Sequence, residues 1–131
     1  LKHCVVQGHA SSAKGPFAAP PSAAGPGRSM SVLDEIALRH RTDKSSRRHN
    51  YAQFYDRILR GARLRELRFL EVGIGTGETM EFMGKAYKPG ASLRMWAEYF
   101  PNAQLVAGID TEAECMFQEG SIRTALADSR D

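Results

Sequence analysis

Apolar residues recur along much of this chain at the spacing of one helix face. This pattern predicts helices over residues 31–40, with Ser31 as the N-cap, over residues 51–60, and over residues 92–100, where Pro101 ends the helix. In the second helix the apolar positions follow an i, i+3, i+4, i+7, i+8 pattern. We therefore expect one buried face, formed by Tyr51, Phe54, Tyr55, Ile58 and Leu59.

Three short apolar runs predict β-strands, over residues 67–72, 104–109 and 122–126. Right-handed crossovers would place these strands side by side and parallel. Residues 78–91 contain glycine and proline and are predicted to form a loop inserted before the third helix. The predicted fold class is α/β, with about three parallel strands and flanking helices, which is half of a doubly wound sheet.

The first 29 residues differ from the rest in composition. They are rich in proline, alanine, glycine and serine, and they lack the apolar periodicity needed for a core. We expect residues 1–29 to be a disordered or non-native tail and residues 30–131 to be the domain, with a natural start at Met30. A functional disordered arm is the alternative. The incomplete sheet further suggests that the domain is a fragment of a longer protein.

Length, charge and cysteine content limit the number of domains, the partners and the location to be expected of this protein. The 131 residues are enough for one domain. The net charge is +3, but three of the 18 basic residues and none of the 15 acidic ones lie in residues 1–29, so the predicted domain is neutral. We therefore expect neither a nucleic-acid nor a membrane partner. Cys4 and Cys115 are far apart, as expected for free thiols in a reducing compartment, and no apolar run is long enough to span a membrane. A cytoplasmic location is expected.

The candidate chemistry lies after the strand at residues 67–72. Glu71 is followed by Gly73, Gly75 and Gly77, at every second position. Glycine tolerates positive φ and has no Cβ, so such a turn lets the backbone approach a ligand closely. An ordinary tight turn between a strand and a helix is the alternative. The spacing differs from the GxGxxG of nicotinamide-binding proteins and resembles motif I of class I S-adenosylmethionine (SAM) methyltransferases.

Asp110 directly follows the second predicted strand. In dinucleotide-binding units, an acid at this position accepts hydrogen bonds from ribose hydroxyls. Its distance from Gly77 exceeds the usual spacing of roughly 20 residues, which the inserted loop explains. An acid that caps the next helix is the alternative.

Residues outside the glycine turn resemble a known family, the macrocin-type sugar O-methyltransferases. The similar blocks are Thr42-Asp43-Lys44, His49-Asn50-Tyr51, Glu71 to Gly75, Ser92 to Trp96, Tyr99 to Ala103, and Gly108-Ile109-Asp110. The resemblance implies a Rossmann-like SAM methyltransferase fold, of which only the first half is present. It also implies methyl transfer from SAM to a sugar hydroxyl on a macrolide, glycolipid or polysaccharide. The implied cofactor-binding residues are Thr42, Glu71, Gly73, Gly75, Thr76, Gly77, Ser92, Asp110 and Asp128.

The same resemblance implies groups that this chain does not supply. Family members use Mg²⁺, bound by acids later in their sequences, and a catalytic base from the same region. No metal ligand or base can be assigned in residues 1–131, and His40 and His49 are candidates for the base by residue type only. We therefore expect the fragment alone to be inactive and the whole protein to act on a small or glycosylated substrate. A homo-oligomer is one expected state of the whole protein.

Two other function classes stay open from the sequence. The chain could be a catalytically incompetent remnant or an interaction module that keeps the start of the fold without its active site. A nicotinamide-dependent oxidoreductase is disfavoured by the alternate spacing of the glycines.

Overall fold

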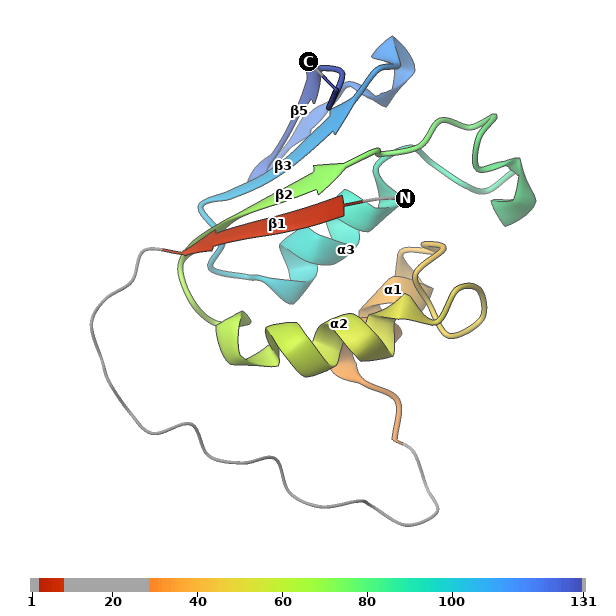
Figure 1. Ribbon diagram of the computed structural model, residues 1–131. Helices are drawn as coiled ribbons and strands as arrows, with labels where there is room; N and C mark the ends of the chain where they lie inside the picture. The colour runs from red at the N-terminus through yellow and green to blue at the C-terminus, as the bar shows by residue number, and fades with distance from the viewer. Residues whose placement is uncertain (1–2, 9–28, 131) are drawn as a thin grey trace.

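A computed structural model describes residues 3–8 and 29–130 (Figure 1). The helices are α1 (Val32–Arg39), α2 (Tyr51–Leu59) and α3 (Ala91–Tyr99), and short 3₁₀ turns lie at Arg60–Ala62, Glu81–Met83 and Ala113–Cys115. The strands are β1 (His3–Gly8), β2 (Leu67–Val72), β3 (Leu105–Asp110), β4 (Gln118–Glu119) and β5 (Ile122–Leu126). All the predicted helices and strands are present.

The strands form one five-stranded sheet in the order β1-β2-β3-β5-β4. β2 pairs with β3 and β3 with β5, in both cases parallel, which confirms the predicted α/β class and its three parallel strands. The sequence did not predict the two edge strands. β1 and β4 are both antiparallel to their neighbours, so the sheet is mixed.

Strand β1 corrects part of the prediction for residues 1–29. These residues were expected to be disordered or non-native, yet residues 3–8 pair along the whole of β2, from His3 opposite Val72 to Gly8 opposite Leu67. The edge of β2 presents unpaired backbone groups, and a short segment can pair with them whatever the composition of its surroundings. Residues 9–28 lie outside the described part, and the native or foreign origin of the segment stays a prediction.

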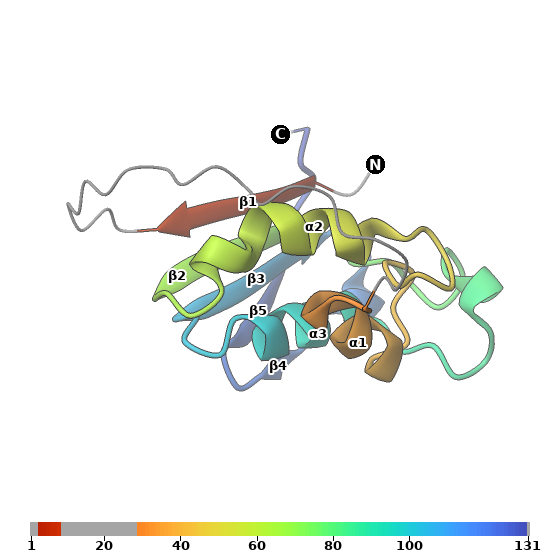
Figure 2. The same ribbon diagram turned by 90° about the horizontal axis from the view of Figure 1, so that it is seen from below.

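The three helices cover one face of the sheet (Figure 2). α1 contacts α2 and α3, and α3 packs against β3 and β5. A Cβ added at Gly108 in β3 would lie 2.6 Å from Leu93 Cδ1 of α3, so glycine is what permits this close approach. None of the helices in the described ranges has the length and hydropathy of a membrane span.

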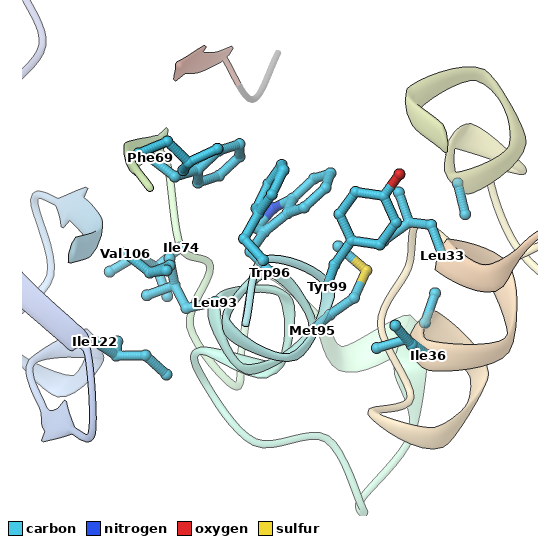
Figure 3. Packing of buried hydrophobic residues seen from close by; sticks show 14 of the residues in the cluster. Leu33, Ile36, Phe69, Ile74, Leu93, Met95, Trp96, Tyr99, Val106 and Ile122 are labelled. Carbon is cyan, nitrogen blue, oxygen red and sulfur yellow. The ribbon is translucent and has the colours of Figure 1, made fainter. Parts of the chain in front are cut away.

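An aromatic cluster fills the space between the sheet and the helices. Figure 3 shows Trp96 lying between Phe69 of β2 and Tyr99. The ring centroids of Phe69 and Trp96 are 4.7 Å apart, and those of Trp96 and Phe100 are 5.9 Å apart. The Tyr99 hydroxyl donates a 3.0 Å hydrogen bond to Asp56 Oδ1, which ties α3 to α2.

The predicted buried face of α2 is wrong. The helix instead turns Ala52 and Asp56 inward, where Ala52 is small enough to be fully buried and Asp56 accepts the hydrogen bond from Tyr99. Periodicity alone cannot tell which face of a helix is buried when a polar residue has a buried partner. Of the five predicted residues, Tyr55 and Leu59 are partly buried, whereas Tyr51, Phe54 and Ile58 are 51%, 58% and 57% exposed.

Candidate functional site

The carboxyl ends of β2 and β3 meet at the glycine turn, which we call the glycine loop (residues 73–77). Gly73 N donates a 2.9 Å hydrogen bond to Ile109 O, so the loop leaves β2 directly beside the end of β3. Gly73 and Gly75 have φ angles of 83° and 92°. Residues with a Cβ rarely adopt these angles, so the backbone requires glycine at positions 73 and 75. Gly77 has no positive φ, and a Cβ added there would meet nothing within 4 Å.

Asp110 holds this loop in place. Its Oδ2 accepts hydrogen bonds from Ile74 N at 2.7 Å and Gly75 N at 3.0 Å, while its Oδ1 accepts one from Glu112 N at 3.1 Å. Partial burial by itself would raise the pKa of Asp110, but the backbone hydrogen bonds from Gly75, Glu112 and Ile74 outweigh it and hold the pKa below its ordinary value of 3.8. The carboxylate is therefore ionised at neutral pH and acts only as an acceptor.

Glu71 is fully buried near the end of β2 and forms an ion pair with a residue that the sequence did not single out. Lys44 Nζ lies 2.7 Å from Glu71 Oε1 and 3.7 Å from Asp43 Oδ1, and Lys44 is 2% exposed. Glu71 Oε2 has no hydrogen-bond partner among the described residues. A buried carboxylate oxygen without a donor is costly, so a ligand that brings a donor would be favoured there.

Lys44 lies in a polar loop after α1, and residues 42–45 of this loop are buried. Thr42 Oγ1 accepts a 2.9 Å hydrogen bond from Lys44 N, and Lys44 O accepts one from Ala52 N at 2.9 Å. Thr42 and Ser45 are both below one-tenth exposed. Thr42 therefore shapes the loop that delivers the Lys44 ammonium to Glu71. The signal available in the sequence was a cation needed to compensate an acid inside an apolar strand.

Three further predicted residues lie around the loop. Thr76 N donates to Thr79 Oγ1 at 2.9 Å and Thr79 N donates to Thr76 Oγ1 at 3.0 Å, so the Thr76 hydroxyl stabilises the turn. Gly77 N donates to Glu114 Oε1 at 2.9 Å. Ser92, in the first turn of α3, is buried, and its Oγ has no partner within the part of the chain that the structure describes.

Asp128 differs from the other predicted residues, because its backbone lies near the site but its carboxylate pairs with another residue. Ala127 N donates a 2.9 Å hydrogen bond to Asp110 O, so the segment after β5 runs beside the end of β3. The Asp128 carboxylate, however, pairs with Arg130, which lowers the pKa of Asp128. The structure therefore brings the backbone next to Asp128, but not its charge, to the site.

The two histidines considered as a base are engaged elsewhere. His40 Nε2 lies 2.6 Å from Glu98 Oε2, and His49 stacks on Tyr51 with ring centroids 5.5 Å apart.

Burial raises the pKa of the Cys115 thiol to about 11, so this thiol is protonated at neutral pH. Within residues 3–8 and 29–130, no three histidine, cysteine or acidic side chains form a group that could hold a metal ion.

Tyr87 is a second residue at the site that the sequence analysis missed. It lies in the inserted loop, and its hydroxyl is 3.4 Å from Ile74 O and 3.3 Å from Gly75 O. The inserted loop therefore folds back over the glycine loop. Periodicity offered no signal for this contact, because it joins two irregular segments.

A separate cleft of about 470 Å³ lies between the end of α1, the inserted loop and β4. It is lined by ionisable side chains, which are those of Arg39, His40, Arg41, Lys88, Arg94 and Glu119. Arg39 and His40 both contact Glu98, and Arg94 pairs with Glu119. None of the predicted cofactor-binding residues lines this cleft, so it is not the predicted cofactor site.

The fold and the site define a class of protein. Parallel strands that end in a glycine loop and a neighbouring acid are typical of Rossmann-like α/β domains, which bind nucleotide-like ligands at the carboxyl edge of the sheet. No protein-family model matches the chain. The MycE methyltransferase from the mycinamycin biosynthetic pathway, solved in complex with Mg, SAH and mycinamycin VI, has a similar structure. The TM-score is 0.60 and the identity 33%, over 76% of this chain and 25% of that one.

Characterised proteins extend this similarity. L-olivosyl-oleandolide 3-O-methyltransferase from Streptomyces antibioticus is 42% identical over 78 residues, which is 60% of this chain and 18% of that protein. Demethylmacrocin O-methyltransferase from Streptomyces fradiae is 35% identical over 99 residues, 76% of this chain and 23% of that protein. The chain is therefore a homologue of the macrocin-type sugar O-methyltransferases, as its motifs predicted, and it spans about a quarter or less of the length of these relatives.

Proposed function

We propose that this chain is the SAM-binding part of a sugar O-methyltransferase. The observation that carries the proposal is the glycine loop held by Asp110 Oδ2 beside a buried Glu71, whose Oε2 has no donor among the described residues. The relatives named above are sugar O-methyltransferases, which supports the proposal. The whole protein would methylate a sugar hydroxyl on a glycosylated small molecule such as a macrolide, or on a glycolipid or polysaccharide.

The residues present fit this cofactor. SAM carries an ammonium, a carboxylate and a ribose, and when bound it supplies an electrophilic methyl group. Glu71 Oε2 would accept a hydrogen bond from the ammonium, and Asp110 Oδ1 would accept one from a ribose hydroxyl. Ser92 Oγ, buried and without a partner among the described residues, would gain a polar contact from the cofactor. The carbonyls of the glycine loop are further acceptors for the ammonium.

The remaining parts of the mechanism are assigned to no described residue. We propose that the base and the Mg²⁺ ligands of the whole protein are groups other than those of residues 3–8 and 29–130. The contribution of the present residues to catalysis would be to bind the cofactor and orient its methyl group for in-line attack. A cytoplasmic location, a homo-oligomer and the absence of a nucleic-acid partner remain predictions.

Calorimetric titration of the 131-residue chain with S-adenosylhomocysteine (SAH), and separately with NAD, tests the proposal. We expect binding of SAH only. Asp110→Asn should weaken it by about tenfold or more, the range for a hydrogen bond to a charged group. Glu35→Gln, which removes an exposed acid on α1, is the control and should leave affinity unchanged. Binding of NAD alone would contradict the proposal, and binding of neither would favour the non-catalytic remnant.

A further inference from the structure

The Tyr87 hydroxyl occupies acceptors that a cofactor would use. It lies within hydrogen-bond distance of two carbonyls of the glycine loop, Ile74 O at 3.4 Å and Gly75 O at 3.3 Å. A phenol has one proton to donate, so these two long contacts share it. These carbonyls belong to the glycine loop, at the carboxyl edge of the sheet where the proposed cofactor would bind.

The surroundings of this hydroxyl are acidic. Burial raises the pKa of Tyr87, and the negative charges of Asp43, Glu71 and Asp110 raise it further, so the phenol stays neutral and acts as a donor. These carboxylates come from three different segments of the chain, the loop after α1 and the ends of β2 and β3. The Lys44 ammonium, beside Glu71 and Asp43, offsets one of these three negative charges, so the region stays negative and favours a further cation over a neutral phenol.

The segment that carries Tyr87 is otherwise weakly attached. Gly84, Lys85, Ala86 and Lys88 are all exposed, whereas Tyr87 is partly buried against the glycine loop. The hydroxyl contacts are therefore the main polar attachment of residues 84–88 to the site. Segments with few buried contacts open at low free-energy cost.

We propose that Tyr87 is a latch that competes with the ammonium of SAM. In the absence of cofactor it donates to the glycine-loop carbonyls and holds residues 84–88 over them. The cofactor's ammonium displaces the hydroxyl from the same acceptors, so Tyr87 lowers the affinity for ligands that carry this ammonium. The competition with SAM rests on the proposed function, whereas the latch contact itself does not.

Tyr87→Phe tests this inference because it removes the hydroxyl and keeps the ring. We expect the variant chain to bind SAH about fivefold more tightly, the effect of one ordinary hydrogen bond. Methylthioadenosine, which lacks the amino-acid part of SAH, should bind both chains equally. Tyr51→Phe removes an exposed hydroxyl on α2 and is the matched control, with no expected change. Without any ligand, the amides of residues 84–88 should exchange with deuterium faster in Tyr87→Phe.

Unchanged or weaker SAH binding by Tyr87→Phe would overturn the competition. An equal gain for methylthioadenosine would also overturn it, because the effect would then not involve the ammonium. If the wild-type chain and Tyr87→Phe both fail to bind SAH, the proposed function fails. The latch contact is then decided by exchange alone, and unchanged exchange of residues 84–88 would overturn it.

Discussion

Two fully buried regions lie along strand β2 and are built from opposite kinds of side chain. In the middle of the strand, Phe69 packs against Trp96 in an aromatic cluster. Two residues further on, Glu71 is equally buried but meets the Lys44 ammonium. Burial of aromatic surface stabilises the fold, whereas a buried ion pair roughly offsets its own desolvation.

The contrast between the two regions shows where buried polar atoms without hydrogen-bond partners lower the stability of the domain. The aromatic cluster has one unpaired polar atom, Trp96 Nε1, on a side chain whose large apolar surface outweighs that cost. Two other buried atoms without a partner among the described residues are Glu71 Oε2, near the carboxyl end of β2, and Ser92 Oγ, in the first turn of α3, and both side chains have little apolar surface. Such groups are expected where a ligand completes the set of hydrogen bonds.

The strongest test of the stabilising region is Trp96→Ala. It should lower the free energy of unfolding by about 4 kcal/mol, because it removes the central ring and leaves a cavity. Urea denaturation followed by circular dichroism measures this. Phe54→Ala, on the exposed face of α2, is the control and should change stability by about 0.5 kcal/mol or less. Equal losses in the two variants would contradict the assignment of the core.

A somewhat smaller loss of unfolding free energy is expected when the buried ion pair of Lys44 and Glu71 is broken. Lys44→Met should cost about 3 kcal/mol, because it leaves the Glu71 carboxylate buried without its cation. The double variant Lys44→Met/Glu71→Leu should recover most of this stability while SAH binding stays lost. A double variant as unstable as the single one would show that packing of the Lys44 stem, not charge, is what matters.

The hydrogen bond between Tyr99 and Asp56, which links α3 to α2, should stabilise the fold less than the ion pair between Lys44 and Glu71 does. Tyr99→Phe removes the hydroxyl that donates to Asp56 Oδ1, and we expect a loss of about 1 kcal/mol in urea denaturation. Tyr51→Phe again serves as the control, since the Tyr51 side chain is half exposed. The prediction fails if both variants have the stability of the wild type.

The smallest effect is a pH dependence at Asp110, which is partly exposed and therefore screened. Its pKa is lower in the folded state than its ordinary value of 3.8, so it stabilises the fold above pH 3.8 and loses this effect as pH falls through the folded pKa. Asp110→Asn should thus be less stable than the wild type at pH 7, with a difference that shrinks below pH 3.8. Thermal unfolding from pH 3 to pH 7 measures this, and a pH-independent difference would contradict it.

The parts predicted well are those with local causes. The predicted bounds of β2 and β5 agree with the structure, because short apolar runs bounded by polar residues define them. Ser31 caps α1 by accepting a hydrogen bond from Asp34 N at 3.2 Å, a pattern that spans three residues. Of the site, the sequence predicted a glycine turn directly after β2, and Gly73 and Gly75 there have positive φ angles. The hydrogen bonds from Ile74 N and Gly75 N to Asp110 were not predicted, because Asp110 was expected to contact a ribose or to cap the next helix.

The parts missed depend on partners far away in the chain. Strand β1 exists through pairing with β2, and the exposed face of α2 follows from the contact between Asp56 and Tyr99, 43 residues apart. Lys44 was not among the predicted site residues, and it is buried in an ion pair with Glu71, 27 residues later. Tyr87 lies in the inserted loop, and periodicity does not predict which residues of an irregular loop contact the glycine loop.

The sequence by itself therefore determined the parallel α/β core, the glycine turn and the similarity to sugar O-methyltransferases, because each rests on residue types at short spacing. Only the tertiary structure decided which groups surround the glycine loop. Lys44 compensates the charge of Glu71, Asp110 holds the loop backbone, and Tyr87 covers the loop carbonyls. The physical reason is that a buried charge or an unpaired carbonyl is satisfied by whichever group the fold brings near, and sequence spacing does not reveal it.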